Sequence, residues 1–249
     1  MNISWDINNL DIQKVKDFVD KHDNPFVQKR ISRNIQRQNI IIDRNNIIKY
    51  LIMCLLTSQQ RSGPNTPVGR FLQLDPFPLT FETISESINI KEYIKQTLQQ
   101  NGLNRMIENI SKYFSKNFQT LQNDNWALIS IFKTELNGKQ TNQKEREIAD
   151  FLNDIFLGFG PKQSRNFLQG LGLTKYEIPI DSRITNWLND FGFPVTLTSS
   201  PLQDKGYYHF VSDGLQKLCD LSNIYPCVLD AAVFSSYDNG EWNDNNTVF

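Results

Sequence analysis

Apolar residues recur at intervals of three and four along most of this chain. The pattern is clear at Ile94 and Leu98, and it returns at Met106, Ile110 and Phe114. Such spacing gives each helix one apolar face, whereas no long alternating run of β-branched residues bounded by turns is present. We therefore predict an all-α fold of about ten helices and no sheet.

Helix breakers agree with this interpretation. Asn101-Gly102 and Asn137-Gly138 are typical helix ends, Gly172 ends a third helix, and Pro226 stands near the first turn of the last one. The segment 61–78 is rich in glycine and proline, so we expect it to be largely loop. A chain of 249 residues, 39% of them hydrophobic, is long enough for one large or two modest domains with an apolar core.

Composition argues against several classes of protein. No apolar stretch approaches the roughly 20 residues that a membrane helix needs, and the N-terminus lacks the basic-then-apolar pattern of a signal peptide. Three cysteines, one of them in the apolar run 50–56, do not suggest a disulfide framework and are too few to ligate an iron–sulfur cluster. The two histidines have no zinc-ligand spacing. We expect a cytoplasmic protein with no metal and no other cofactor.

Charge is nearly balanced overall but unevenly distributed. The formal net charge is −1, yet residues 21–62 carry eight basic and two acidic residues, and residues 200–249 carry seven acidic and two basic ones. The first stretch suits a phosphate backbone and the second does not. From charge alone, two oppositely biased solvated faces are the simpler interpretation.

Two charged residues stand at the starts of successive predicted helices. Lys162 follows a turn in which Gly158 and Gly160 flank Phe159, and Asp181 comes nineteen residues later. Glycine permits a positive φ and a close approach of backbone amides to a phosphate, as in a hairpin that grips DNA. The helix dipole disfavours a cation at Lys162, so its amine loses a proton more easily and suits nucleophilic attack. Asp181 is a favoured N-cap whose carboxylate stays ionised.

Each of these features also has a purely structural explanation. A Gly-x-Gly-x-Lys turn often only ends a helix, a lysine at a helix end is commonly a surface residue, and Asp181 caps its helix whatever else it does. Gln59, Gln60 and Arg61 form an ordinary polar helix terminus. Long amide side chains beside a basic loop are also suited to fill the gap that remains when a base leaves its stack.

In combination, the motifs resemble the helix-hairpin-helix DNA glycosylase superfamily. Leu-Thr-Ser-Gln-Gln at 56–60, Gly-Phe-Gly-Pro-Lys at 158–162 and Ile-Asp-Ser-Arg at 180–183 occur in the family's order and spacing. The lysine-bearing hairpin is similar to that of the bifunctional 8-oxoguanine glycosylase/lyases in particular. The match covers residues 55–188, with its middle supported by helical pattern only.

The resemblance implies a two-lobed all-α enzyme whose DNA groove runs between the lobes, with the hairpin at their junction. We expect residues 43–172 to form a helical lobe that ends in the hairpin, and residues 1–42 plus 173–249 to form the second lobe. The implied function is base excision repair: a nucleoid-associated monomer removes 8-oxoguanine from double-stranded DNA and then cleaves the strand.

The resemblance also assigns roles to single residues. Lys162 matches the nucleophile that forms a Schiff base, and Asp181 matches the aspartate that assists departure of the base. Gly158 and Gly160 match the hairpin that holds a phosphate, and Gln59 matches the amide that fills the vacated space. Further DNA contacts are expected from Gln60, Arg61 and Arg183. The base pocket is assigned to Asn166, Phe234 and Trp242, since the family places base contacts near the end of the chain.

The sequence departs from the family pattern at several points. Leu157 stands where many relatives have proline, Ser182 and Arg183 replace a pairing that contains histidine, and the cluster cysteines of the endonuclease III branch are missing. Two alternatives remain open. One is a glycosylase of this superfamily for an oxidised pyrimidine or an alkylated purine, and the other is a non-catalytic DNA-binding module. Asp181 favours an enzyme over a module, because a carboxylate beside the groove opposes phosphate binding.

Overall fold

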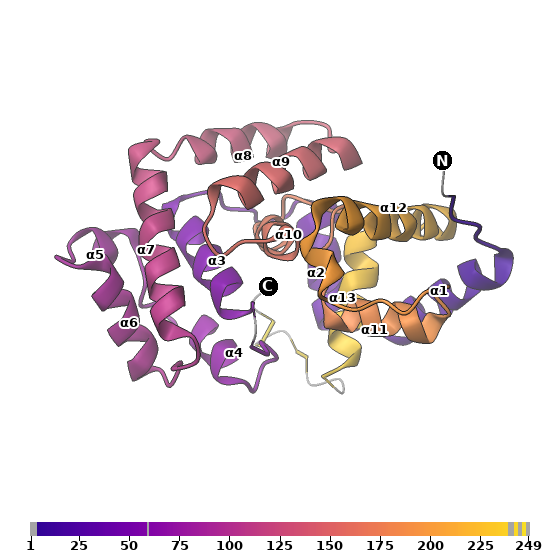
Figure 1. The fold of residues 1–249 in the computed structure, drawn as a ribbon, viewed down its shortest axis with the longest axis horizontal. Helices are drawn as coiled ribbons and strands as arrows, with labels where there is room; N and C mark the ends of the chain where they lie inside the picture. Colours follow the sequence, from indigo (N-terminus) through magenta and orange to yellow (C-terminus); the bar gives the residue numbers. More distant parts are fainter. Residues whose placement is uncertain (1–3, 59, 239–241, 244–245, 248–249) are drawn as a thin grey trace.

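The structure is a computed structural model that describes residues 4–58, 60–238, 242–243 and 246–247. These residues form thirteen α-helices and no strand, so the predicted all-α class is confirmed. Figure 1 shows two groups of helices with α10 (Pro161–Gly170) between them. The helices that the periodicity missed have only five or six residues, which is too short for an apolar repeat to show.

The first group of helices follows the middle of the chain. It comprises α3 (Arg44–Leu56), α4 (Pro67–Leu72), α5 (Phe81–Ser85), α6 (Ile90–Gln100), α7 (Ile107–Asn123), α8 (Ala127–Asn137) and α9 (Asn142–Ile155), and it ends in α10. Asp43 caps the start of α3. Nine residues of this helix are buried, so it is apolar on nearly every side. It packs against α7 and α10 as the centre of the group.

Both ends of the chain build the second group. It comprises α1 (Asn9–Lys21), α2 (Pro25–Arg30), a π-helical turn η1 (Ile31–Ile35), α11 (Ser182–Phe191), a 3₁₀ turn η2 (Pro201–Gln203), α12 (Lys205–Ser222) and α13 (Pro226–Ser236). None of the helices in the described part of the chain is long and apolar enough to cross a membrane.

Each group has its own hydrophobic core. One core consists of buried residues between Ile42 and Leu173, and the other combines residues of Val15–Val27 with residues between Ile178 and Trp242. The division into lobes at 42/43 and 172/173 stays a prediction, and these two separate clusters support it. We call the groups the first and second lobe below.

The glycine- and proline-rich segment 61–78 is loop, as expected, except for the single helix α4. Pro67 is the first residue of this helix, and the Thr66 hydroxyl accepts a hydrogen bond of 3.0 Å from the Gly69 N–H. Proline is favoured at the first helical position because that N–H has no helical partner. A proline read as a breaker therefore starts a helix here.

Candidate active site

The turn between α9 and α10 is a tight hairpin held from both sides. Gly158 has φ +80°, and a Cβ there would lie 2.6 Å from the Tyr113 ring. The Asn117 side chain accepts a hydrogen bond of 2.8 Å from the Leu157 N–H and donates one of 2.9 Å to the Leu157 carbonyl. Gly160 has φ −125°, which any residue adopts, so only Gly158 needs the conformational freedom that the sequence suggested for both glycines.

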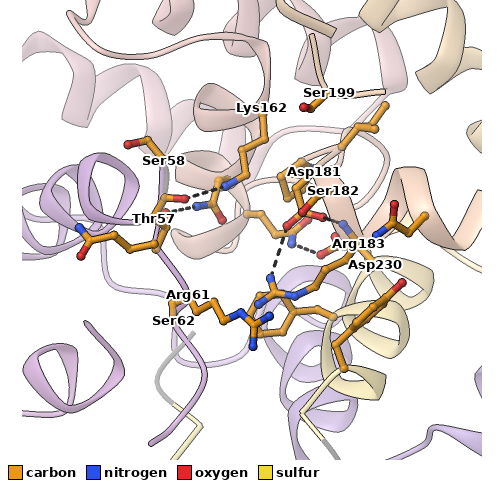
Figure 2. A pocket seen from close by; sticks show the side chains of 18 of the residues that line it. Thr57, Ser58, Arg61, Ser62, Lys162, Asp181, Ser182, Arg183, Ser199 and Asp230 are labelled. Atoms are coloured by element: carbon orange, nitrogen blue, oxygen red, sulfur yellow. Dashed lines mark hydrogen bonds and ion pairs between the residues drawn. The ribbon is translucent and has the colours of Figure 1, made fainter. Parts of the chain in front are cut away.

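Lys162 is the second residue of α10 and its amine enters the space between the lobes. Nζ donates a hydrogen bond of 3.4 Å to the Thr57 carbonyl at the end of α3 (Figure 2). Burial lowers the pKa of Lys162, the charge of Arg183 lowers it further, and Asp181 opposes both effects. The sequence argument relied on the helix dipole, but the main cause of the lowered pKa is desolvation.

Asp181 is the N-cap of α11, as its sequence context indicates. Its Oδ1 accepts hydrogen bonds from the Arg183 N–H at 2.8 Å and the Ile184 N–H at 3.2 Å. Its Oδ2 lies 3.4 Å from Nη1 of Arg183. The helix terminus therefore fixes the direction of the carboxylate. Oδ1 is used for capping, and Oδ2 faces Arg183 and the open space.

Lys162 and Asp181 line one cavity of about 520 Å³ (Figure 2). Its wall is formed by residues of both lobes and contains most of the sequence-predicted site: Gln60, Arg61, Lys162, Asn166, Asp181, Arg183 and Phe234. Gly158 and Gly160 do not line it. Gln59 lies outside the described residues.

Trp242 lies behind the cavity wall. Its ring centroid is 4.5 Å from that of Phe26 and 5.8 Å from that of Phe234, and these two residues form part of the wall. The Arg183 guanidinium covers Phe234, with Cζ 4.1 Å from the ring centroid. A base can stack on this face of Phe234 only after Arg183 moves, and Trp242 supports the ring from behind.

A buried cluster of three polar residues in the cavity wall escaped the sequence analysis. Asp230, Gln169 and Arg30 are buried, and Gln169 Nε2 donates a hydrogen bond of 2.5 Å to Oδ2 of Asp230. Nη1 of Arg30 lies 3.6 Å from the same oxygen. Asp230 is the one charged residue of helix α13, which is otherwise apolar as far as Phe234, and this was the available signal.

Asp230 has an unusual protonation equilibrium and an open hydrogen-bonding position. Burial raises the pKa of its carboxyl to about 7, although the charge of Arg30 opposes the effect. Oδ1 has no hydrogen-bond partner among the described residues, while Oδ2 faces Gln169 and Arg30. The cavity therefore presents one acceptor oxygen whose charge changes near neutral pH.

No group of three or more His, Cys, Asp or Glu side chains that could hold a metal ion occurs in the part of the chain that the structure describes. The groups positioned for chemistry are the Lys162 amine, whose pKa is lowered, and the carboxyl groups of Asp181 and Asp230, all in one cavity. Such a set can attack an electrophilic carbon and stabilise a neighbouring positive charge.

Comparison with known proteins identifies the fold. No protein-family model and no curated protein matches the sequence. Among solved structures, the 8-oxoguanine DNA glycosylase of Thermotoga maritima matches with a TM-score of 0.64 at 13% identity, over 92% of this chain and 96% of that one. The 8-oxoguanine DNA glycosylase of Methanocaldococcus jannaschii matches with a TM-score of 0.62 at 16% identity, over 93% and 96%.

A second M. jannaschii structure, the 8-oxoguanine glycosylase/lyase in complex with 15mer DNA containing 8-oxoguanine, matches with a TM-score of 0.66 at 17% identity, over 93% of this chain and 99% of that one. All three are all-helical proteins of the helix-hairpin-helix type, and they match along nearly the whole chain. This protein therefore has the helix-hairpin-helix fold of the 8-oxoguanine DNA glycosylases.

Proposed function

We propose that the protein is a DNA glycosylase with AP lyase activity, which removes 8-oxoguanine from duplex DNA and cleaves the strand. One observation carries the proposal: the amine of Lys162 and the carboxylate of Asp181 line one cavity between the lobes. Nineteen residues separate them in the sequence, and each is aimed by the first turn of its own helix. The fold shared with 8-oxoguanine DNA glycosylases supports it.

The first step is displacement of the damaged base. The lesion nucleotide leaves the duplex and enters the cavity, and Gln60 or its neighbour Gln59 fills the gap in the stack. The neutral amine of Lys162 attacks C1′ of the deoxyribose as the bond from C1′ to the base breaks, and the base departs with a proton. Asp181 offsets the positive charge that develops on the sugar.

The second step is strand cleavage. Loss of a proton from the attacking nitrogen and opening of the sugar ring give an imine between Nζ of Lys162 and C1′. Removal of a C2′ proton then expels the 3′ phosphate by β-elimination, which breaks the bond from C3′ to oxygen. Because the imine links protein to DNA, borohydride reduces it to a stable secondary amine.

The cavity wall supports the proposed substrate class. The Watson–Crick edge of guanine and of 8-oxoguanine presents two N–H donors and one carbonyl acceptor. Oδ1 of Asp230 is an acceptor with no partner among the described residues, and the Gln169 amide lies beside it. A guanine edge, oxidised or not, therefore fits this wall better than a base with an acceptor at the same place, and this supports a purine of the guanine type as the substrate.

The partner in this proposal is duplex DNA bound by a monomer. The hairpin at Gly158 and Gly160 contacts one phosphate through backbone amides, and Arg61 and Arg183 stand at the cavity where the backbone enters. A glycosylase/lyase with the same fold was crystallised with DNA containing 8-oxoguanine, which supports this arrangement.

Borohydride trapping tests the proposal. Incubation with a duplex that carries one 8-oxoguanine should yield a nicked strand and, with borohydride, a covalent protein–DNA adduct. Lys162→Gln should abolish both. Lys144→Gln is the matched control, because Lys144 also lies in the first turn of a helix but is exposed; it should trap like the wild type.

Two results would contradict the proposal. Trapping that survives in Lys162→Gln assigns the nucleophile to another amine. Salt-sensitive DNA binding without any nicking, even at a preformed abasic site, identifies a non-catalytic module. A panel of duplexes with single oxidised or alkylated bases then decides whether 8-oxoguanine is the preferred lesion.

A further inference from the structure

Tyr208 of α12 is a fully buried hydroxyl group that the proposed mechanism does not use. Its Oη donates a hydrogen bond of 2.7 Å to the Ile178 carbonyl and accepts one of 2.7 Å from the Ile180 N–H. Burial raises the pKa of Tyr208, so the hydroxyl keeps its proton and makes both bonds at any physiological pH. One side chain thereby satisfies the carbonyl of the residue before Pro179 and the N–H of the residue after it.

This contact lies one residue before the catalytic carboxylate. Ile180 immediately precedes Asp181, and the Ile178–Ile180 segment is buried and has no regular secondary structure. Asp181 has no backbone contact to the first lobe among the described hydrogen bonds, so its position depends on the start of α11 and on this segment. Tyr208 therefore holds the backbone that enters the N-cap.

The other face of Tyr208 contacts the helix that carries the nucleophile. Cζ of Arg165 lies 4.9 Å from the Tyr208 ring centroid, and Arg165 is one helical turn after Lys162 on α10. The Arg165 side chain is fully buried and its Nε donates a hydrogen bond of 2.8 Å to Glu177. Cation–π contacts strengthen when they are desolvated. The ring of Tyr208 thus contacts α10, and its hydroxyl contacts the segment that precedes Asp181.

We propose that Tyr208 is a positioning residue that sets the place of Asp181 relative to Lys162. This proposal rests on the function proposed above. The link runs from α10 through Arg165 to the Tyr208 ring, and from the Tyr208 hydroxyl to the backbone of Ile178 and Ile180. The two groups needed at C1′ come from different lobes, and a third element, α12, ties them together.

The proposal separates two reactions that share the cavity. Departure of the base needs Asp181 at its correct place, because positive charge develops on the sugar as the bond breaks. Imine formation at a preformed abasic site needs Lys162 but expels no base. Loss of the Tyr208 hydroxyl should therefore slow base excision much more than the reaction at an abasic site.

Single-turnover kinetics of Tyr208→Phe test this difference. The ring and its contact with Arg165 remain, while the Ile178 carbonyl and Ile180 N–H lose their partner. We expect the rate constant for 8-oxoguanine excision to fall about 10- to 100-fold, as for a small misplacement of a catalytic group. Borohydride trapping on a duplex with a preformed abasic site should change less than about threefold, and Asp181→Asn should show the same selective pattern.

Tyr207→Phe is the matched control. Tyr207 adjoins Tyr208 on α12, is half-buried, and its hydroxyl has no hydrogen-bond partner among the described residues. This variant should keep both rate constants. With enzyme in excess, the rate constants do not depend on the folded fraction. If Tyr208→Phe does not fold, Pro179→Ala frees the backbone between the two bonded groups and should give the same selective loss.

The outcomes distinguish the two proposals. A wild type that neither excises 8-oxoguanine nor traps at an abasic site refutes the proposed function itself. A wild type that does both, together with variants in which excision and trapping fall by the same factor or not at all, refutes the positioning role of Tyr208 and leaves the proposed function intact.

Discussion

Among single residues, the ionisation state of Lys162 matters most. In the proposed mechanism its amine attacks only when neutral, and burial in the cavity wall lowers its pKa from the ordinary value of 10.5. Two neighbours act in opposite directions: the Asp181 carboxylate raises the pKa of Lys162, and the Arg183 guanidinium lowers it. Desolvation is thus the main cause of the lowered pKa of Lys162, and two charged residues of the opposite lobe adjust it.

The rate of borohydride trapping at a preformed abasic site should therefore rise with pH and reach its plateau below pH 10.5. Asp181→Asn removes the charge that raises the pKa of Lys162, so the inflection should move to lower pH. Asparagine also caps a helix, so the fold should persist. Arg183→Gln should move the inflection to higher pH, and equal inflections in all three proteins would exclude this electrostatic coupling.

Asp230 gives a second residue-scale prediction, for base recognition. The pKa of its carboxyl is about 7, and only the ionised form is a strong acceptor for the N–H groups of a guanine edge. The ratio of 8-oxoguanine excision to abasic-site trapping should therefore rise as the pH increases through about 7.

Asp230→Asn keeps the shape of the side chain but cannot ionise. The same ratio should become independent of pH in this range and fall about tenfold at pH 8, the difference between a neutral and a charge-assisted hydrogen bond. The ratio is the right measurement, because Arg30 loses its buried partner and overall stability also changes. An inflection near pH 7 that persists in the variant belongs to another group.

At the scale of elements, the hairpin between α9 and α10 is the segment that we propose holds a DNA phosphate. Gly158 combines a positive φ with close packing against Tyr113 and Leu55. Gly102, which follows α6, has φ +74° and open space where a Cβ would stand. The two glycines therefore share the same left-handed backbone conformation and differ in their surroundings.

Gly158→Ala and Gly102→Ala form a matched pair. Each should lose about 1–2 kcal/mol of unfolding free energy from placing alanine in the left-handed region. Gly158→Ala should lose more, because the Tyr113 ring must move, and it should bind duplex DNA about tenfold more weakly, the worth of one misplaced charge-assisted hydrogen bond. Chemical denaturation and gel-shift titration measure the two effects. Equal DNA affinity in both variants would remove the hairpin from the DNA interface.

For the whole molecule, a buried ion cluster joins the two lobes. Glu177 is fully buried, and its carboxylate accepts hydrogen bonds from Arg146 of α9 at 2.9 Å, from Arg165 of α10 at 2.8 Å and from Gln216 of α12 at 2.8 Å. Glu177 belongs to the connection between α10 and α11, which carry the proposed catalytic pair. The cluster thus sets how the lobes meet, and with that the shape of the cavity.

Glu177→Gln should reduce the free energy of unfolding by about 3 kcal/mol, because the fully buried Arg165 and the partly buried Arg146 keep their charge and lose this carboxylate, while Asp150 and Asp213 still pair with them. Glu108→Gln is the control. Glu108 also contacts two basic side chains, Lys91 and Lys95, but its own side chain is 57% exposed, so its removal should leave stability unchanged. Urea denaturation measures the stability of both variants. If the two variants are equally stable, the Glu177 cluster does not stabilise the fold.

What the sequence determined by itself is local. Helical periodicity, the glycine at the hairpin, Lys162 in a first turn and Asp181 as a cap depend on neighbours within a few residues, and all are found in the structure. The order and spacing of three motifs also pointed to the correct fold.

Tertiary structure alone decided the cavity and its chemistry. It placed Asp230, Gln169 and Arg30 beside Lys162, covered Phe234 with Arg183, and put Trp242 behind the wall. It also made burial, rather than the helix dipole, the main reason for the lowered pKa of Lys162. These properties depend on distances and desolvation between residues far apart in the chain, and such quantities exist only once both cores have packed and the lobes have met.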